Sequence, residues 1–226
     1  MIAWEKLPEQ MRSDAVRPYY EILKKKKVSL FCKRLFDLVA SAVLIVVLSP
    51  VLLGIAIWIK RDSEGPVFYR QERVTRYGKK FRIFKFRTMV TNADKIGSLV
   101  TTQGDSRITK VGQKIRASRL DEIPQLFNIF LGDMSFVGTR PEVQKYVDAY
   151  TSEMWATLLL PAGVTSPTSI RFKNEDEKLS ALTEQGMSVD QAYIDVILPE
   201  KMEINLKYLK EFTFFKDIAV CVKTVV

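Results

Sequence analysis

An unbroken apolar run dominates the first third of the chain. Residues 38–59 contain no charged side chain, and as one straight helix they would be about 33 Å long, close to the thickness of a bilayer core. The run is too long for the apolar part of a cleavable signal peptide, and 37 mostly polar residues precede it. The pattern therefore predicts a helix that holds the protein at a membrane.

Basic residues flank this run on both sides. Lys24–Lys27 precede it, and Lys60 and Arg61 follow it. A spanning helix concentrates Lys and Arg on one side, whereas a re-entrant helix leaves both ends on the same, positively charged side. Pro50 lacks a backbone N–H and disfavours a straight helix, and the Ser49 hydroxyl can bond a carbonyl that the proline frees. We interpret the segment as a re-entrant helix broken at Ser49-Pro50, with a kinked single span as the alternative.

Beyond this run the pattern changes to that of strands. Residues 67–75 and 81–89 are rich in aromatic and β-branched side chains, and a turn at Gly78 separates them, which predicts a small β-hairpin. At a period of two, Lys85 and Arg87 share one face of the second strand. Two neighbouring cations suit a diphosphate, although a solvated strand face is the alternative.

Composition and charge limit the kinds of catalytic and metal site that this chain can form. The 226 residues include 35 Lys and Arg, 26 Asp and Glu, two Cys and no His. The segment 60–119 alone holds 16 basic and 5 acidic residues, a net charge of +11, which indicates contact with phosphates. Without histidine, Ser-His pairs, Cys-His pairs and His-containing zinc sites are excluded, so catalysis would depend on carboxylates, Lys, Arg and hydroxyls. Two cysteines are too few for a disulfide framework and favour a reducing compartment.

A pair of carboxylates follows the basic region. Asp121 and Glu122 come just after Arg116 and ahead of an apolar run. Ser118, with an acid three residues later, fits a helix N-cap. A helix N-terminus offers N–H groups and the positive end of the helix dipole to carboxylates, phosphates and a bridging cation. The pattern predicts a site at this position, with a plain capping box as the alternative.

A glycine-flanked loop, residues 132–138, leads to Arg140-Pro141. The proline keeps the preceding backbone extended, so it directs the Arg140 side chain out of any helix. A loop arginine of this kind suits a phosphate contact, and a surface turn is the alternative.

Eight short motifs occur along the chain in a defined order. Each is weak by itself, but their ordered combination is specific, and it resembles the bacterial sugar transferases, in particular the small monotopic phosphoglycosyl transferases that begin glycan assembly on a polyprenol phosphate. The resemblance runs from about Phe31 to the C-terminus. The motifs are Lys33–Leu38, Ser49-Pro50, Gly65–Val67, Lys85–Met89, Leu120–Glu122, Pro124–Leu126, Gly132–Ser135 and Arg140-Pro141.

The resemblance implies a fold and a location. The fold would be α+β, mostly α, with a re-entrant membrane helix, a small β-hairpin and interfacial amphipathic helices around a cytosolic active site. The chain would divide into an amphipathic, polybasic extension (1–30), the re-entrant helix (31–61) and a cytosolic catalytic domain (62–226). The protein would lie on the cytosolic face of the bacterial inner membrane.

The resemblance also implies a ping-pong transfer of a sugar-1-phosphate from a UDP-sugar to a polyprenol phosphate. Asp121 would attack the β-phosphate, release UMP and hold the phosphosugar covalently. Glu122, with Asp121 beside it, would hold Mg²⁺, which neutralises charge on the diphosphate. An unperturbed Asp is ionised at neutral pH, so the reaction needs no histidine. The residues expected to bind phosphate oxygens are Lys85, Arg116 and Arg140, with Arg87 as a weaker candidate.

This chain departs from the family pattern at three points. Arg119 stands where the family often has a serine before Leu-Asp-Glu, and Thr139 stands where it often has a proline. After Thr165, many relatives continue with Gly-Trp-Ala and this chain does not, which leaves the sugar open. We expect Thr165 and Arg171 to line the nucleotide-sugar side, with a pairing of Arg171 to Glu175 as the alternative.

The alternative function is that of a membrane-anchored protein whose basic region binds nucleic acid or anionic lipid without catalysis. Such a protein needs cations but has no use for Asp121 and Glu122 between arginines. We therefore expect a UDP-sugar, a polyprenol phosphate and membrane lipid as partners, and no nucleic acid. The oligomeric state, including a homodimer, stays open.

Overall fold

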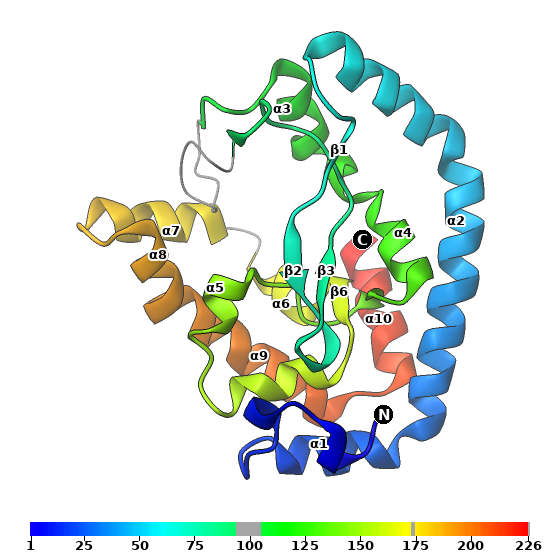
Figure 1. The fold of residues 1–226 in the computed structure, drawn as a ribbon, viewed down its shortest axis with the longest axis vertical. Coiled ribbons are helices and arrows are strands. Elements are labelled where there is room, and N and C mark those ends of the chain that lie inside the picture. Colours follow the sequence, from blue (N-terminus) through cyan, green and yellow to red (C-terminus); the bar gives the residue numbers. More distant parts are fainter. Residues whose placement is uncertain (94–104, 173–174, 226) are drawn as a thin grey trace.

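The computed structural model describes residues 1–93, 105–172 and 175–225. Helices predominate in these residues, and the strands are short, as expected for a mostly helical α+β chain (Figure 1). The helices are α1 (Arg17–Lys25), α2 (Lys27–Asp62), α3 (Lys110–Ala117), α4 (Gln125–Leu131), α5 (Gln144–Val147), α6 (Pro167–Arg171), α7 (Glu175–Glu184), α8 (Val189–Ala192), α9 (Leu198–Glu211) and α10 (Phe214–Val225). The strands are β1 (Phe68–Tyr69), β2 (Glu72–Val74), β3 (Lys80–Arg82), β4 (Lys85–Phe86), β5 (Met134–Val137) and β6 (Ala162–Thr165).

The predicted hairpin is present, divided into two short antiparallel ladders. In one, β2 pairs with β3 with Arg73 opposite Phe81, and in the other β1 pairs with β4 with Phe68 opposite Phe86. Gly78, in the connecting turn, has a φ of 72°, a left-handed conformation that glycine adopts without steric cost. The turn therefore lies where the sequence predicted it.

A second pair of strands was not predicted. β5 and β6 are parallel, with Met134 opposite Ala162. The loop after β5 passes so close to β6 that a Cβ at Gly163 would come within 2.1 Å of the Gly138 backbone nitrogen. Glycine is required at this crossing because the two backbones touch. The pairing positions the loop that carries Arg140.

The long helix α2 continues through Ser49-Pro50, so the predicted break is absent from the backbone. The proline leaves the Val46 carbonyl without its usual N–H donor, and the Ser49 hydroxyl donates to that carbonyl at 2.8 Å. Because this bond replaces the lost one, the helix curves along one side of the molecule without interruption (Figure 1). α2 is long and apolar enough to cross a membrane by length and composition.

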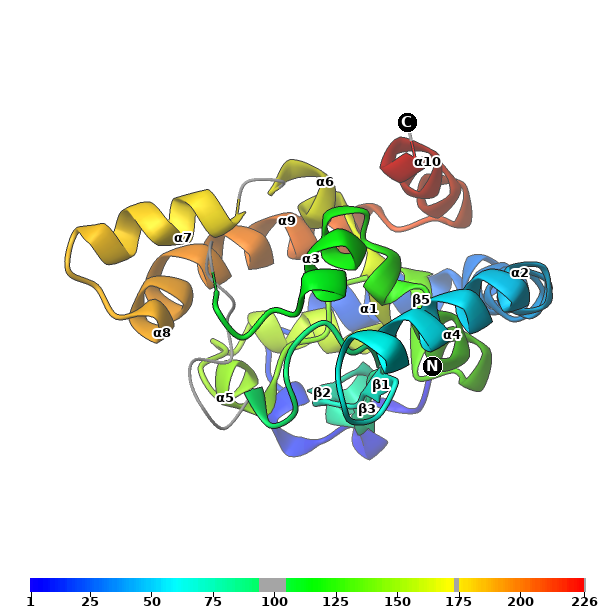
Figure 2. The same ribbon diagram turned by 90° about the horizontal axis from the view of Figure 1, so that it is seen from above.

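Both halves of α2 pack against the same body. Near its start, Arg34 donates to the carbonyls of Ile129 and Phe130, at 2.8 and 2.9 Å, where α4 ends. Near its end, Ile55 and Ile59 are buried with residues of α3. The helix therefore lies along the rest of the chain and does not project from it (Figure 2).

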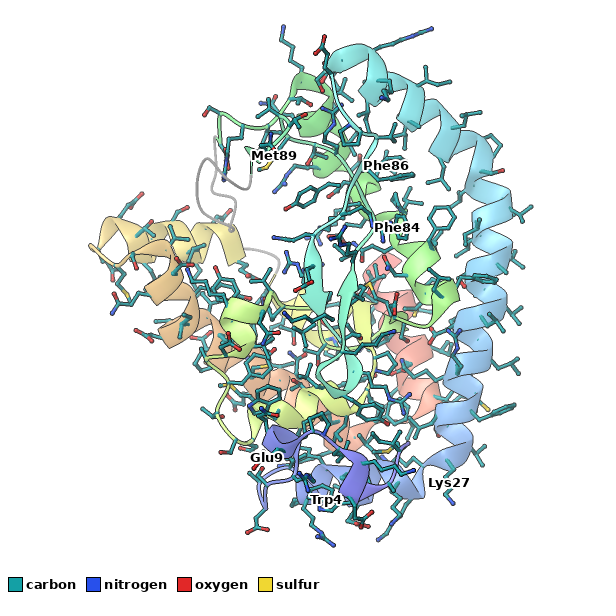
Figure 3. The ribbon with its side chains drawn as sticks, viewed as in Figure 1. Trp4, Glu9, Lys27, Phe84, Phe86 and Met89 are labelled. Atoms are coloured by element: carbon teal, nitrogen blue, oxygen red, sulfur yellow. The ribbon has the colours of Figure 1, made fainter. Side chains whose placement is uncertain are left out.

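The largest core joins the N-terminal segment to the C-terminal helices. Met11, Tyr20 and Leu23 are buried in one cluster with Leu159 and Met202. In Figure 3, Trp4, Glu9 and Lys27 all lie at the lower end of the molecule. Burial of this apolar surface holds residues 1–25 against the remainder of the chain.

A buried ion pair connects α2 to α10. Lys33 Nζ lies 2.5 Å from Asp217 Oδ2 and donates to the Val137 carbonyl at 2.6 Å. The Tyr208 hydroxyl donates to the other oxygen of Asp217 at 2.7 Å. Because the ammonium and the carboxylate both have several partners, the pair is fully satisfied despite its burial. These contacts give the Lys33–Leu38 motif a structural role.

Replacing Lys33 with methionine is expected to lower the free energy of unfolding by about 3–5 kcal/mol, because Asp217 would then be a buried charge without its cation. Lys79→Met is the matched control. Lys79 also pairs with a carboxylate, Asp133, but its side chain is 70% exposed, so the expected cost is under about 1 kcal/mol. Thermal unfolding of both variants in nanodiscs measures the difference, and equal stabilities would refute the role of the buried pair.

Candidate active site

Asp121 and Glu122 lie on a single 3₁₀ turn between α3 and α4. Asp121 is buried, with 8% of its surface exposed. Arg119, just before the turn, has a φ of 54° and so adopts the left-handed conformation. A residue other than glycine is uncommon there and often occurs at functional sites. The chain therefore leaves α3 sharply and turns the two carboxylates inward.

Ser118 is not the helix N-cap that the sequence suggested, so the alternative of a plain capping box is wrong. The Ser118 hydroxyl donates to the Lys114 carbonyl at 3.0 Å, so it caps the end of α3 and not the start of the next helix. Pro124 precedes α4 directly. The sequence pattern misled because Ser118 and Asp121 have the right spacing, but the left-handed residue between them separates two helical segments.

Two cations from distant parts of the chain meet the carboxylate pair. Lys85 Nζ lies 3.0 Å from Glu122 Oε1 and 3.9 Å from Asp121 Oδ2. Arg140 Nη2 lies 2.6 Å from the same Glu122 oxygen. β4 supplies Lys85, and the loop after β5 supplies Arg140. The structure thus brings together four of the predicted site residues.

Aromatic packing fixes the strand that carries Lys85. Phe86 stacks on Phe68 with ring centroids 5.5 Å apart, and Phe84 packs against Phe127 of α4 at 5.6 Å. The backbone N–H of Phe84 donates to Asn128 Oδ1 at 2.8 Å. Phe84 and Phe86 lie close to each other in the upper half of the view in Figure 3. These contacts tie β4 to α4 and so set the position of the Lys85 ammonium.

The charges around Glu122 keep it ionised. Burial raises the pKa of this carboxyl, but Arg140 and Lys85 together outweigh burial and hold the pKa well below its usual range. In turn, Glu122 raises the pKa of Arg140 above its ordinary value. Glu122 is therefore a permanent anion that orients both cations.

Asp121 differs from its neighbour. Burial raises the pKa of Asp121 above that of an ordinary aspartate, and Lys85 only partly opposes this effect. An anion that is poorly solvated and incompletely paired is a better nucleophile than one held in a short ion pair. The geometry therefore favours Asp121 over Glu122 as the attacking carboxylate.

A pH dependence follows from this raised pKa. In the nucleophilic role that the sequence predicts for Asp121, only its carboxylate form would attack, so activity is expected to fall as the pH drops through a midpoint above about 3.9, the ordinary value for Asp. Lys85→Met removes the cation that opposes the shift, so it should move the midpoint further up. The initial rate of UMP release between pH 4 and pH 8 measures this. A midpoint that Lys85→Met moves down would contradict the assignment.

In the described part of the chain, two further predicted cations, Arg87 and Arg116, form no ion pair with Asp121 or Glu122. Arg87 donates to the Ser63 carbonyl at 2.8 Å and to the Glu64 carbonyl, and so secures the end of α2. Lys85 and Arg87 therefore do not converge on one place, contrary to the strand pattern, because the strand ends at Phe86. Arg116, on α3, contributes a positive charge that lowers the pKa of Asp121.

Thr165 ends β6, and Arg171 ends α6. The Thr165 hydroxyl is 2.7 Å from the Thr224 hydroxyl of α10. Arg171 is exposed. Glu175, the alternative partner for Arg171, lies 3.2 Å from Lys201 Nζ instead. The assignment of both residues to the nucleotide-sugar side stays a prediction.

An apolar cavity of about 570 Å³ adjoins Glu122. Its walls come from the 3₁₀ turn with Glu122 and from α2, α4, β5, β6, α6 and α10, and half of its lining residues are aliphatic. The lining includes Leu44, Leu48, Ile123, Leu126, Val164 and Ile170, with Arg119, Glu122, Thr165, Lys223 and Thr224 as polar or charged members. One side of the carboxylate cluster is therefore suited to an apolar group.

A smaller cavity, of about 130 Å³, adjoins Arg140 and is polar. Lys201 is buried there and donates to the Tyr193 hydroxyl at 2.8 Å, and that hydroxyl donates to Glu142 Oε1 at 2.6 Å. Arg73 also lines this cavity. Sequence analysis missed these residues because they are spread over four segments, and only Glu142, beside Arg140-Pro141, stands next to a motif.

At this site, the described side chains that could bind a metal ion are the carboxylates of Asp121 and Glu122. Among the described residues, no group of three or more His, Cys, Asp or Glu side chains could hold a metal ion. Mg²⁺ is usually bound by one or two carboxylates together with substrate phosphates and water. Asp121 and Glu122 fit this donor set when a diphosphate completes it.

Comparison with known proteins identifies the family of this chain. Residues 28–226 match the family model described as bacterial sugar transferase. Over 199 residues the chain is 34% identical to the UDP-N-acetylgalactosamine-undecaprenyl-phosphate N-acetylgalactosaminephosphotransferase of Aeromonas hydrophila, which covers 86% of this chain and 43% of that protein. It is 32% identical over 222 residues to the UDP-glucose:undecaprenyl-phosphate glucose-1-phosphate transferase of Escherichia coli strain K12, covering 96% and 44%.

A shorter relative is matched over more of its own length. The UDP-glucose:undecaprenyl-phosphate glucose-1-phosphate transferase of Caulobacter vibrioides is 32% identical over 196 residues, which cover 85% of this chain and 68% of that protein. The chain spans less than half the length of the Aeromonas and Escherichia relatives. Because the family model extends over nearly all of the chain, the protein belongs to the bacterial sugar transferase family.

Proposed function

We propose that this protein transfers a sugar-1-phosphate from a UDP-sugar to a polyprenol phosphate and thereby begins the assembly of a glycan at a membrane. The observation that carries the proposal is the buried Asp121, which lies beside Glu122, Lys85 and Arg140. An apolar cavity that α2 helps to line adjoins this cluster. The relatives named above have UDP-sugars and undecaprenyl phosphate in their names.

In the first step, an Asp121 oxygen attacks the β-phosphorus of the UDP-sugar. The bond between this phosphorus and the bridging oxygen breaks, and UMP leaves with that oxygen and its electron pair. Lys85 and Arg140 carry donors that can contact the phosphate oxygens, and the arginine can bind two of them at once. Both cations lower the energy of the transition state, in which the phosphates gain negative charge.

In the second step, a phosphate oxygen of the polyprenol phosphate attacks the same phosphorus. The bond to Asp121 breaks, so the free carboxylate returns and a polyprenol diphosphate sugar is released. No proton must move between side chains, because both the nucleophile and the acceptor are anions. This agrees with a site that has no histidine.

We also propose that Asp121 and Glu122 hold Mg²⁺ together with the donor diphosphate. The ion would neutralise charge on the diphosphate and on departing UMP. Glu122 suits this task because it stays ionised between its two cations.

We propose that both ends of the curved helix α2 stay on the cytosolic side, with its apolar middle immersed in the membrane. Arg34 and Ile59, near opposite ends of α2, both contact the same folded body, and Val46 and Val47, near its middle, are 73% and 63% exposed. A straight crossing would carry one end of this body into the bilayer, where its polar groups lose their water. Amphipathic α10, with Phe215 82% exposed, would lie in the interface.

The topology can be tested by labelling. Cysteines introduced at Lys25 and at Arg61, in a chain whose own two cysteines are replaced by serine, should both react with a membrane-impermeant maleimide only after inverted vesicles expose the cytosolic face. Reaction of one of them in intact cells would indicate a spanning helix.

The proposed activity is tested with the protein in nanodiscs, Mg²⁺, a polyprenol phosphate and a panel of UDP-sugars. UMP and a lipid-linked sugar should both form with at least one donor, which also identifies the sugar. Absence of both products with every donor, from folded protein, would refute the function. Binding of nucleic acid without turnover would favour the alternative of a basic binding protein.

A further inference from the structure

The donor step described above leaves the aliphatic walls of the cavity beside Glu122 without a role. Leu44 and Leu48 of α2 line it, and so does Ile123, which directly follows the catalytic turn. The neighbouring Val47 faces outward and is 63% exposed. The cavity therefore adjoins the segment of α2 that would lie in the bilayer, and it extends to the carboxylate cluster.

Two cations also line the cavity. Arg119 precedes the catalytic turn, and Lys223 is on α10. Neither side chain forms an ion pair with any residue of the described ranges, whereas Lys85 and Arg140 are both paired. The hydroxyls of Thr165 and Thr224, 2.7 Å apart, connect α10 to β6 beside Lys223. Two unpaired cations next to aliphatic walls suit a ligand with an anionic head and an apolar tail.

We propose that this cavity is the subsite for the acceptor, in which aliphatic walls receive the first isoprenoid units of the polyprenol and Arg119 and Lys223 hold its phosphate. The inference rests on the proposed function and adds the location of the second substrate. Glu122 lines this cavity, whereas its two cations, Lys85 and Arg140, do not. The acceptor phosphate would therefore reach the phosphorus on Asp121 from the cavity, through the position that UMP has left. α10 thereby contributes a binding residue to a site whose catalytic residues lie between Lys85 and Arg140.

This position fits the second step. A phosphate oxygen held by Arg119 and Lys223 attacks the phosphorus on Asp121, and the phosphorus–Asp121 bond breaks with its electron pair returning to the carboxylate. Arg119 and Lys223 neutralise the charge of the entering phosphate, which would otherwise be repelled by Glu122. They have no role in the release of UMP, because that step precedes entry of the acceptor.

The two half-reactions separate this inference from the proposed function. Without acceptor, the amplitude and rate of UMP release report the donor step. When polyprenol phosphate is then added, the loss of the phosphosugar from the protein reports the acceptor step. Leu48→Trp, which fills the cavity, should leave UMP release within about twofold and slow the acceptor step at least about tenfold. Val47→Trp places the same side chain on the outer face of α2 and should change neither step.

The cations are tested in the same way. Lys223→Gln and Arg119→Gln together should raise the KM for polyprenol phosphate about tenfold or more, because each lost charge-assisted hydrogen bond weakens binding. The KM for the UDP-sugar should not change. Lys223→Arg, which keeps the positive charge, should retain most of the wild-type affinity for polyprenol phosphate. Lys216→Gln is the control, since Lys216 is on the same helix but pairs with Glu211.

Each outcome has one meaning. An unchanged acceptor KM and an unchanged acceptor step, in variants that release UMP normally, would overturn the inference and leave the function intact. If wild-type protein released no UMP, the proposed function itself would fail. If Leu48→Trp did not fold, the cation variants would decide. If the KM for the UDP-sugar and the KM for polyprenol phosphate rose equally, the cations would act on the whole site. That result would also contradict an acceptor subsite.

Discussion

Asparagine in place of Asp121 is expected to lower turnover by at least about 10⁴-fold, the scale of loss seen when a covalent nucleophile is removed. The amide has almost the shape of the carboxylate but cannot form the bond to phosphorus. Stability should be retained or increased. Burial raises the pKa of Asp121, so its ionised form destabilises the folded state at neutral pH and a neutral side chain relieves that cost.

Turnover of the lipid-linked product and thermal unfolding measure the two effects. Asp148→Asn is the matched control, because Asp148 is an exposed carboxylate that accepts a hydrogen bond from Gln144 at 2.7 Å, and it should change neither quantity. Asp121→Ala guards against slow deamidation of the asparagine back to aspartate. If Asp121→Asn or Asp121→Ala kept more than about 1% of the wild-type rate, Asp121 could not be the nucleophile.

Replacing Arg140 with methionine has the second largest expected effect, a loss of about 10²–10³-fold in kcat/KM for the UDP-sugar. Arg140 Nη2 lies 2.6 Å from Glu122 Oε1, so the substitution removes a phosphate donor and also half of the positive charge that keeps Glu122 ionised. The pKa of Glu122 should rise because burial is then opposed by Lys85 alone. Weaker binding of Mg²⁺ is the expected consequence.

Titration of the activity with Mg²⁺ checks this prediction. Arg140→Met should need a higher Mg²⁺ concentration for half-maximal rate, and Arg140→Lys should recover part of kcat/KM, because lysine restores the charge but not the two parallel hydrogen bonds. Arg82→Met, on the neighbouring hairpin and exposed, serves as the control. Full activity of Arg140→Met would exclude a role in phosphate binding.

Local sequence signals predicted the elements that depend on neighbouring residues. The apolar run, the strands on both sides of Gly78 and the bond from Ser49 to a carbonyl freed by Pro50 all appear in the structure. The parallel pair of β5 and β6 was not predictable, because 24 residues separate the two strands and nothing in either strand specifies its partner. The continuity of helix α2 was missed because the charges on both flanks and Pro50 favoured a break, although the sequence also offered the Ser49 hydroxyl that bonds the freed carbonyl.

The site was predictable in its residues and not in its geometry. Asp121, Glu122, Lys85 and Arg140 were identified from short motifs, and the structure brings their side chains together. Arg87 has the same strand pattern as Lys85, but it bonds the end of α2 because β4 stops one residue earlier. The residue types and their two-residue alternation along the strand do not show where a short strand ends. The acceptor cavity also needed the structure, because its walls come from several elements.

Detection of the covalent intermediate tests the central claim most directly. Protein in nanodiscs is incubated with Mg²⁺ and the active UDP-sugar without acceptor, and its intact mass and acid-labile peptides are measured. A mass increase of one phosphosugar, on the peptide that contains Asp121 and absent from Asp121→Asn, is the predicted result, with UMP in equal amount. An unchanged mass, together with UMP release that begins only when polyprenol phosphate is added, would show direct transfer between the substrates and contradict the ping-pong mechanism.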